Sequence, residues 1–323
     1  MKVKRIGVMT SGGDAPGMNA AIRSVVRTAA ASGVEVVGVK GGYRGLLTSN
    51  VVPLGVRDVG GILTRGGTML GSGRVPEFKE PGAPDQAIAN ARTMAIDGLV
   101  AIGGDGTQAG GLALHTLGFP VVGVASTIDN DLAGFDMSIG VDTALNTAMS
   151  MVDRLRDTAS SHHRAFIVEV MGRHSGYLAL MVGLACGAEI TLVPESPYTT
   201  GDVENALRAA YAAGKSHFVC VAAEGSPLKA ADLAADLKSR DPAFEIRLSV
   251  LGHVQRGGGP TIFDRLLGTR SAAVATQALL AGQSGVVAGL VRGRYDFVPS
   301  ASAVRDVSKV PADLLDLAVT LAL

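Results

Sequence analysis

The sequence has few aromatic residues, few cysteines and no excess of charge of either sign. Aromatic residues make up 4% of the 323 positions and tryptophan is absent, which argues against a platform for stacking single-stranded nucleic acid. Lys plus Arg and Asp plus Glu both number 29, so no net field favours nucleic acid or an anionic membrane as a partner. The two cysteines, Cys186 and Cys220, lie in apolar segments without metal-ligand spacing. This predicts a reducing setting.

Long hydrophobic runs are also missing. The apolar residues that follow the basic N-terminal positions are too few for the core of a signal peptide. The most apolar later segment, residues 177–188, has twelve residues, fewer than the ~20 that span a bilayer. We therefore expect a cytoplasmic protein.

Glycine is the residue in excess, with 43 of 323 positions. That is about twice the usual ~7%, and no Gly-X-Y period or low-complexity tract accounts for it. The glycines are therefore expected in tight turns and at close backbone approaches.

Short apolar runs alternate with helix-compatible segments. Because these runs are apolar throughout, they predict strands buried on both faces, and the alternation predicts a mainly parallel α/β sheet. A long amphipathic helix is expected over 141–160, where it could carry the chain between domains. The expected strands are Arg5–Thr10, Val34–Lys40, Gly98–Ile102, Val121–Ala125, Phe166–Val170, Ile190–Val193, Phe218–Ala222 and Val286–Leu290.

Two segments, "RIGVMTSGGDAPGMNAAIR" and "GLVAIGGDGTQAGG", both run from a strand through Gly-Gly-Asp toward a helix. Ligands gather at the carboxyl ends of parallel strands, so the two turns could face one crevice. The second turn is neither a Walker loop nor a dinucleotide fingerprint. Its alternative interpretation is a plain strand-to-helix turn in which Asp105 is the N-cap.

Three further motifs follow expected strands. "TIDND" places Asp129 and Asp131 at a carboxyl end, where one carboxylate could accept a proton while the other orients a metal's water shell; the alternative is an Asx turn. "VEVMGR" ends in Arg173, which alone would be an ordinary surface residue. "LGHVQRGGGP" puts His253 and Arg256 three apart, a spacing that can clamp a phosphate.

Together, TSGGDAPGMNAAIR, GGDGT, TIDND, RLRDTASSH, VEVMGR and LGHVQRGG resemble the bacterial 6-phosphofructokinases, from about residue 5 to about residue 275. The resemblance implies two similar three-layer α/β domains with mainly parallel sheets and the active site in the cleft between them. It implies an ATP-binding domain over 1–140 and 255–305, and a fructose 6-phosphate-binding domain over 141–254 and 306–323.

This resemblance implies transfer of the γ-phosphoryl of ATP, with Mg²⁺, to the 1-hydroxyl of fructose 6-phosphate. Asp129 matches the general base, Thr127 a group that holds the phosphoryl and sugar, and Arg173 a cation near the transferring group. Arg164 and Arg247 match ligands contributed by a neighbouring subunit, which implies a homotetramer with shared active sites. The fructose 6-phosphate ligands implied are Thr127, Asp129, Arg164, Met171, Gly172, Arg173, Glu224, Arg247, His253 and Arg256.

On the donor side, the resemblance makes Asp105 the residue that helps hold Mg²⁺ and Asp131 a supporting neighbour. Pyrophosphate-using members typically carry a second aspartate after the GGD aspartate, whereas this chain has Gly106, which favours ATP. Ala125–Ser126 matches neither the Pro-Lys of the pyrophosphate type nor the Pro-Gly usual in ATP users. Besides Asp14 in the first turn, the implied ATP-site residues are Gly12, Tyr43, Arg74, Val75, Gly104, Asp105, Gly106 and Thr107.

A second nucleotide site between subunits is also implied by the resemblance, with ADP as activator and phosphoenolpyruvate as inhibitor. Val56 and Ala213 stand where the family has cations, so weaker or altered effector binding is expected. The matching residues are Arg23, Arg27, Arg156, Glu189, Lys215 and His217.

Three alternatives stay open at this point. A pyrophosphate-dependent phosphofructokinase is one. A NAD or lipid kinase, which also carries GGDGT but lacks TIDND, is another. The third is a non-catalytic, ligand-sensing subunit, which the presence of Asp105 and Asp129 disfavours.

Overall fold

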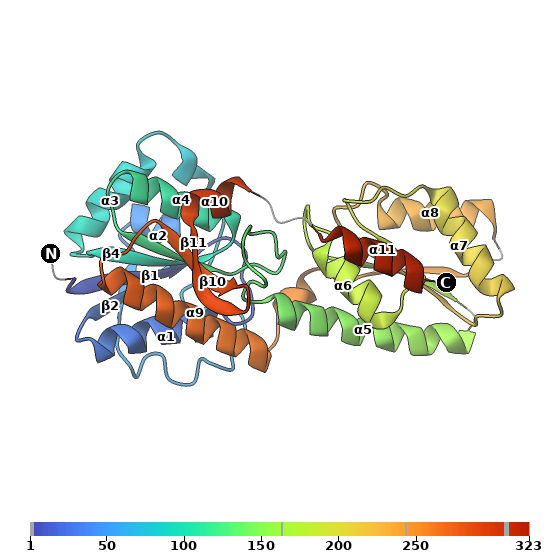
Figure 1. Ribbon diagram of the computed structural model, residues 1–323, viewed down its shortest axis with the longest axis horizontal. Coiled ribbons are helices and arrows are strands. Elements are labelled where there is room, and N and C mark those ends of the chain that lie inside the picture. The colour runs from blue at the N-terminus through green and yellow to red at the C-terminus, as the bar shows by residue number, and fades with distance from the viewer. Residues whose placement is uncertain (1–2, 163, 243, 307–309, 323) are drawn as a thin grey trace. The chain divides into compact units, whose positions relative to one another are not determined.

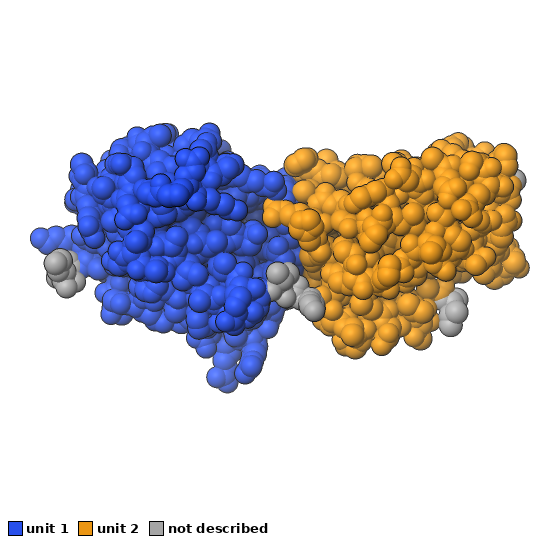
Figure 2. All heavy atoms as spheres, turned by 90° about the horizontal axis from the view of Figure 1, so that it is seen from above, with its two compact units in different colours: residues 1–143, 256–308 blue, residues 144–255, 309–323 orange. Residues whose placement is uncertain are grey.

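The chain folds into two compact units, coloured separately in Figure 2. The computed structural model describes residues 3–162, 164–242, 244–306 and 310–322. Unit 1 is Met1–Thr143 with Arg256–Ser308, and unit 2 is Ala144–Gln255 with Lys309–Leu323. The chain therefore passes between the units three times. In the segment 306–323, which was expected to join the second domain, residues 307–309 and 323 lie outside the described residues.

Unit 1 is built on a seven-stranded sheet in its described part. The five inner strands are parallel, while β3 and β11 pair antiparallel at the two edges. In spatial order the strands are β11 (Arg294–Pro299), β10 (Val286–Val291), β5 (Val121–Ala125), β4 (Gly98–Gly103), β1 (Arg5–Thr10), β2 (Glu35–Val39) and β3 (Val51–Leu54).

Helices cover both faces of this sheet, as Figure 1 shows. On one face α1 packs against α9, and on the other α4 packs against α3 and α10. The helical segments of unit 1 are α1 (Met18–Ala31), α2 (Tyr43–Leu47), η1 (Pro76–Lys79), α3 (Ala83–Thr93), α4 (Asp105–Thr116), α9 (Ile262–Leu280) and α10 (Ser300–Arg305).

Unit 2 contains a four-stranded, fully parallel sheet in the order β7-β8-β6-β9. Figure 1 shows α7 and α8 on one face and α6 on the other, with α11 packed on α6. Helix α5 begins in unit 1 and carries the chain into unit 2. The elements are α5 (Val141–His162), β6 (Ala165–Val170), α6 (Tyr177–Cys186), β7 (Ile190–Leu192), α7 (Thr200–Ala212), β8 (Phe218–Ala223), α8 (Ala230–Arg240), β9 (Ile246–Val250), η2 (Gly252–Arg256) and α11 (Ala312–Leu321).

The expected fold class, α/β with mainly parallel sheets, is confirmed. All eight expected strands form, each within one residue of its expected ends, and the helix expected over 141–160 is α5. Every residue of β4, β5 and β8 is buried, as strands covered on both faces should be. Three strands were missed, β3, β9 and β11, and all three lie at sheet edges.

Candidate functional site

Three turns of unit 1 begin at the carboxyl ends of neighbouring strands in the large sheet. Strands β1, β4 and β5 are parallel neighbours, with Thr10 opposite Ile102 and Gly103 opposite Ala125. The segments that follow these strands start at Ser11, Gly104 and Ser126, so the chain leaves the sheet in the same direction at all three places. The two Gly-Gly-Asp turns and the TIDND turn are therefore side by side.

Backbone hydrogen bonds join the starts of these turns to the neighbouring strands. The amide of Ser11 donates to the Ile102 carbonyl at 3.1 Å, and the amide of Ser126 donates to the Gly103 carbonyl at 3.1 Å. A Cβ on Gly103 would overlap the Thr107 hydroxyl and lie 2.6 Å from the Ser11 carbonyl oxygen. A Cβ on Gly104 would lie 3.3 Å from the Cβ of Thr127. Gly103 is thus required by protein packing, whereas a Cβ at Gly104 would make a tight contact that a small shift of Thr127 relieves.

The start of α4 is the exposed part of this edge. Asp105 is the first residue of the helix and Gly104 is its N-cap, so the interpretation of Asp105 as N-cap is wrong. Asp105 and Gly106 are both exposed, and a Cβ on Gly106 would meet no atom within 4 Å. The first amides of a helix point away from it without intrahelical partners and attract phosphate. This helix end therefore combines open space with a carboxylate.

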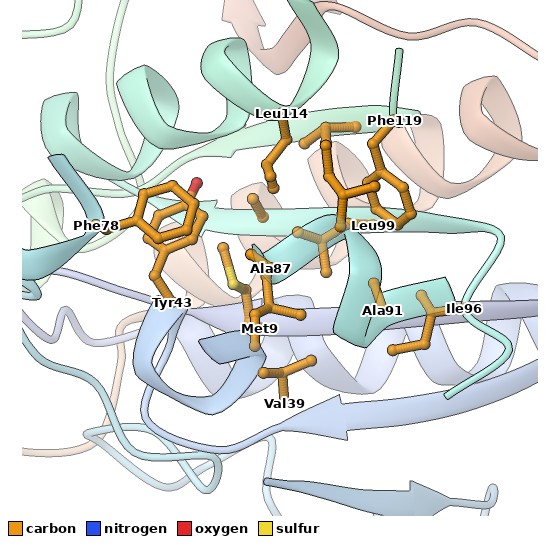
Figure 3. Close-up of a cluster of buried hydrophobic side chains, with 14 of the residues drawn as sticks. Met9, Val39, Tyr43, Phe78, Ala87, Ala91, Ile96, Leu99, Leu114 and Phe119 are labelled. Atoms are coloured by element: carbon orange, nitrogen blue, oxygen red, sulfur yellow. The ribbon is translucent and has the colours of Figure 1, made fainter. Parts of the chain in front are cut away.

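Tyr43 lies beside Phe78 in the hydrophobic cluster drawn in Figure 3, and its hydroxyl supports the GGDGT turn from the core. Its side chain is 3% exposed, stacks on Phe78 with 4.0 Å between ring centroids, and donates its hydroxyl to the Thr107 carbonyl at 2.5 Å. A Cβ on Gly110 would lie 2.5 Å from the ring, so this glycine makes room for Tyr43. Burial raises the pKa of the Tyr43 phenol, which keeps it protonated as a donor.

The other two expected ATP-site residues near this cluster differ in exposure. Val75 is partly buried and packs against the same hydrophobic cluster, while Arg74 is exposed. Their contact with ATP stays a prediction, as does that of Tyr43.

The segment 126–140 carries the TIDND motif. Thr127 Oγ1 accepts from the Asp129 amide at 3.1 Å, and Asp129 is only 3% exposed. Asn130 has a φ of 49° and its side-chain oxygen accepts from the Ser138 amide at 3.0 Å. This bond spans eight residues, so it is not an Asx turn, whereas the Thr127 bond to the amide two residues on is the related turn made by a threonine. Burying a carboxylate is costly, so the burial of Asp129 favours a role beyond the turn, and its action as a base stays a prediction.

Arg256 lies against the first Gly-Gly-Asp turn. Its guanidinium donates to the Asp14 carbonyl at 2.9 Å, and a Cβ on Gly13 would lie 2.8 Å from its Nη1. Arg256 belongs to unit 1, whereas His253, the other half of the expected phosphate clamp, is an exposed residue of unit 2. Their joint action on a phosphate stays a prediction.

In unit 2 the turns after β6 and β8 interlock. The Glu224 carboxylate accepts from the Arg173 amide at 2.7 Å, and the Glu224 amide donates to the Val170 carbonyl at 2.8 Å. Gly225 has no room for a Cβ, which would overlap the Arg173 carbonyl. Arg173 has a φ of 54° and Gly172 one of 139°, so the turn is held in a conformation that ordinary residues seldom adopt. The structure thus brings Met171, Gly172, Arg173 and Glu224 to one edge of this sheet.

Two charged residues at this edge were missed by sequence reasoning. Burial, and then the charge of Glu224, raise the pKa of Glu169 above its ordinary value, while Lys229 opposes them. Lys229 also donates to the Glu224 carbonyl at 2.9 Å. The sequence did offer a sign that Glu169 is unusual, because it is the one charged residue in the apolar run Ala165–Val170. Nothing in the sequence around Lys229 indicated a place at this site.

Arg164 and Arg247 lie near the amino ends of strands in the same sheet, opposite the carboxyl ends that carry Arg173 and Glu224. Both pair with Glu245, at 2.7 Å and 3.5 Å respectively, and the Arg164 guanidinium holds the pKa of Glu245 below its ordinary value. Strand β6, six residues or about 20 Å long, separates them from the turn at Met171. Within one copy of unit 2, these arginines and Arg173 are therefore too far apart to bind one phosphate.

The residues expected in an effector site fall into both units. Arg23 and Arg27 lie on α1 of unit 1. In unit 2, Lys215 pairs with Glu189 at 3.2 Å, and the His217 ring lies 2.9 Å from the Ser160 hydroxyl of α5. Arg156 of α5 pairs with Asp153 at 3.9 Å.

The described part of the chain contains neither a membrane-spanning helix nor a ready-made metal cage. None of its helices is both long and apolar enough to cross a membrane. Nor do three or more His, Cys, Asp or Glu side chains gather there as a ready-made metal cage.

Comparison with known proteins decides the family. The family model for phosphofructokinase matches residues 5–279. The chain belongs to the phosphofructokinase family. It is 52% identical to the ATP-dependent 6-phosphofructokinase 1 of Thermus thermophilus over 323 residues, covering 99% of this chain and 100% of that protein. It is 50% identical to the ATP-dependent 6-phosphofructokinase of Lysinibacillus sphaericus over 288 residues, covering 89% and 90%.

Solved phosphofructokinases share the fold. The structure from Saccharomyces cerevisiae matches with a TM-score of 0.86 at 35% identity, over 94% of this chain; the chain spans 45% of that yeast chain. A pyrophosphate-dependent phosphofructokinase from Marinobacter aquaeolei matches with a TM-score of 0.85 at 22% identity, over 96% of this chain and 86% of that one. At that identity the second likeness shows the fold alone.

Proposed function

We propose that this phosphofructokinase is a glycolytic kinase that transfers the γ-phosphoryl of ATP to the 1-hydroxyl of fructose 6-phosphate, giving fructose 1,6-bisphosphate and ADP. One observation carries the proposal. The buried carboxylate of Asp129 follows β5, and the open N-terminus of α4 follows the neighbouring strand β4. Relatives of about half identity, covered over 90% or more of their length, bear the same activity in their names.

In this proposal Asp129 is the general base. A sugar hydroxyl is a weak nucleophile until its proton has an acceptor, and a positioned base contributes about 10²–10⁴-fold. Asp129 is 3% exposed and its amide is fixed by Thr127 Oγ1, which supports a carboxylate whose position is set before substrate binds. Arg173 then stabilises charge on the transferring phosphoryl, since this chemistry depends mainly on positioning and electrostatics.

The donor is proposed to be ATP because of the space at Gly106. A pyrophosphate-type aspartate there would place a second carboxylate beside Asp105 at the exposed start of α4, where a nucleotide's α-phosphate would be repelled. The Cβ of any residue at this position meets nothing in the protein, so the glycine is not required by packing. This supports a role in admitting a ligand. Pyrophosphate use is the alternative.

Kinases of this family generally need a divalent metal, and we propose Mg²⁺. The residues fit, because Mg²⁺ is usually held by one or two carboxylates together with substrate phosphates rather than by an all-protein cage. Asp105 offers an exposed carboxylate at the helix end that attracts phosphate. When bound, the metal would neutralise phosphate charge, and Asp105 would hold it with Asp131 in support.

The positions of the arginines in unit 2 lead us to propose that two subunits share the active site. Arg164 and Arg247 sit at the opposite sheet edge from Arg173 and Glu224, so both sets can serve one sugar phosphate only if a second copy supplies one of them. We propose a homotetramer in which two subunits contribute residues to one sugar-phosphate site. If light scattering showed that the protein is a monomer under conditions where it is fully active, this proposal would be contradicted. The cytoplasm, where ATP is available, is the proposed location.

An effector site is proposed at Arg23, Arg27, Arg156, Glu189, Lys215 and His217, with weakened binding because Val56 and Ala213 replace cations. The Lys215–Glu189 pair would have to open for that lysine to meet an anion. Activity unchanged by saturating ADP and by phosphoenolpyruvate would count against any working site.

The proposed function is tested by Asp129→Ser. We expect kcat to fall by about 10³-fold with little change in KM for fructose 6-phosphate, because a base acts in the transition state. Asp136→Asn is the matched control, since Asp136 is on the same segment but accepts from the amides of Arg292 and Gly293 at the β10–β11 turn. If Asp129→Ser kept more than about a tenth of wild-type kcat, Asp129 would not be the base.

A further inference from the structure

Asp264 is a buried carboxylate for which the proposed mechanism has no use. It lies in the first turn of α9 and its side chain is 0% exposed. Its Oδ1 accepts from the Gly140 amide at 2.8 Å, and its Oδ2 accepts from the Thr143 amide at 2.8 Å and from the Thr143 hydroxyl at 2.5 Å. No ion pair within the described residues involves Asp264. Its charge is therefore balanced by hydrogen bonds alone.

The contact between α5 and α9 is reciprocal. Asp264 of α9 caps the first amides of α5, while the Thr143 hydroxyl of α5 accepts from the amide of Thr261, the N-cap residue of α9, at 3.1 Å. The Thr261 hydroxyl donates to Asp142 at 2.6 Å. Each helix start thus satisfies donors of the other. An ordinary N-cap needs one short polar side chain, so this double arrangement fixes more than a helix end.

The same junction fixes the two segments that carry the proposed chemistry. Gly140 ends the segment 126–140, and its Cβ, if present, would lie 2.6 Å from the Ala15 Cβ in the first Gly-Gly-Asp turn. A Cβ on Gly17 would lie 2.7 Å from Ile139 and 3.0 Å from the Asp264 carbonyl. Gly140 and Gly17 have φ of 104° and 109°, so the backbones meet directly and only in this conformation.

We propose that Asp264 is a positioning residue that fixes the Asp129-bearing segment 126–140 against the first Gly-Gly-Asp turn. The inference rests on the proposed function, because the catalytic role of Asp129 belongs to it. Charge-assisted hydrogen bonds to three donors are stiffer than neutral ones, and a proton acceptor displaced by about 1 Å can cost about a hundredfold in rate. The hydrogen bonds of the Asp264 side chain go to Gly140 and Thr143, so it acts on this segment through Gly140.

The test compares Asp264→Asn and Thr143→Val with Thr143→Ser in the full chain. Asp264→Asn and Thr143→Val should each lower kcat by about tenfold or more, with KM for fructose 6-phosphate and ATP changed less than about threefold. Thr143→Ser keeps the hydroxyl that binds Asp264 and should keep most of kcat. Ser24→Ala is the control for stability alone, since it removes a 2.6 Å bond from α1 to the Thr269 carbonyl of α9 and leaves segment 126–140 untouched. Its kcat should stay near wild type.

Hydrogen exchange gives a readout that does not depend on activity. Peptides covering 126–140 and 11–17 should exchange faster in Asp264→Asn and Thr143→Val, and at the wild-type rate in Ser24→Ala. If Asp264→Asn does not fold, Thr143→Val carries the test. Unchanged kcat and exchange in Thr143→Val would overturn the positioning role. A wild type that does not phosphorylate fructose 6-phosphate with ATP would overturn the proposed function instead, and exchange would still decide what Asp264 holds in place.

Discussion

The two glycines Gly103 and Gly106 lie in the same motif, yet the structure predicts opposite responses to alanine. A Cβ on Gly103 would overlap the Thr107 hydroxyl and approach the Ser11 carbonyl to 2.6 Å. The second atom is backbone and cannot rotate away, so β1 and β4 would have to separate where their turns begin. A Cβ on Gly106 would meet no atom within 4 Å.

The expected cost of Gly103→Ala follows from overpacking, which destabilises by about 1–3 kcal/mol. For a domain of this size, about 2–4 °C of melting temperature is lost per kcal/mol, so the variant should melt roughly 2–12 °C below wild type. Gly106→Ala sits in the first turn of α4, where alanine is favoured by up to about 1 kcal/mol over glycine. It should melt at or slightly above the wild-type temperature.

Differential scanning calorimetry of the two variants and wild type, side by side at one pH, makes the comparison. Gly106→Ala serves as the matched control, because both changes add one methyl group to the same motif. A Gly103→Ala variant that melts with the wild type, or a Gly106→Ala variant that melts lower than Gly103→Ala, would refute the assignment of these two glycines.

Two further predictions concern charge. Gly106→Asp should raise the KM for ATP about tenfold or more through like-charge repulsion with phosphate, and Gly106→Ala, which fills the space without adding charge, should raise it less; equal KM values in the two variants would remove the electrostatic account of donor choice. Burial raises the pKa of Asp264 from its ordinary 3.8 to about 6, against the hydrogen bonds from Thr143 and Gly140 and with the help of Asp142. The native state holds this proton to higher pH than the unfolded chain does. The stability of wild type relative to Asp264→Asn should therefore fall by about 2 kcal/mol as pH rises from 4 to 7. Urea unfolding at both pH values checks this, and a rise with pH would contradict it.

The strands that the sequence predicted and those that it missed differ in burial. Runs such as Val121–Ala125 are apolar throughout because helices cover both faces. The missed β9 alternates Arg247 and Ser249 with Leu248 and Val250, and it is an edge strand of which only Ile246 is buried. The missed β3 contains a proline and the missed β11 carries charges, and both are antiparallel edges. Edge strands need no continuous apolar run, so their sequences give only a weak indication of a strand.

The candidate site was only partly visible in the sequence. Glycines in the stretch GGDGTQAGG indicated close backbone approaches, but the approach at Gly103 is to Ser11 and that at Gly110 is to the Tyr43 side chain. Asp264 could not be found at all, since "TIFDRLLG" resembles any capped helix start and its partners Gly140 and Thr143 are more than 120 positions away. Contacts of that range come from topology, which local patterns do not encode.

The most direct test of the account is a comparison of phosphoryl donors with fructose 6-phosphate as acceptor and Mg²⁺ present. With ATP we expect formation of fructose 1,6-bisphosphate and ADP, and with pyrophosphate no turnover above background. Turnover with pyrophosphate and none with ATP would contradict the role assigned to the open space at Gly106 and, with it, the proposed function.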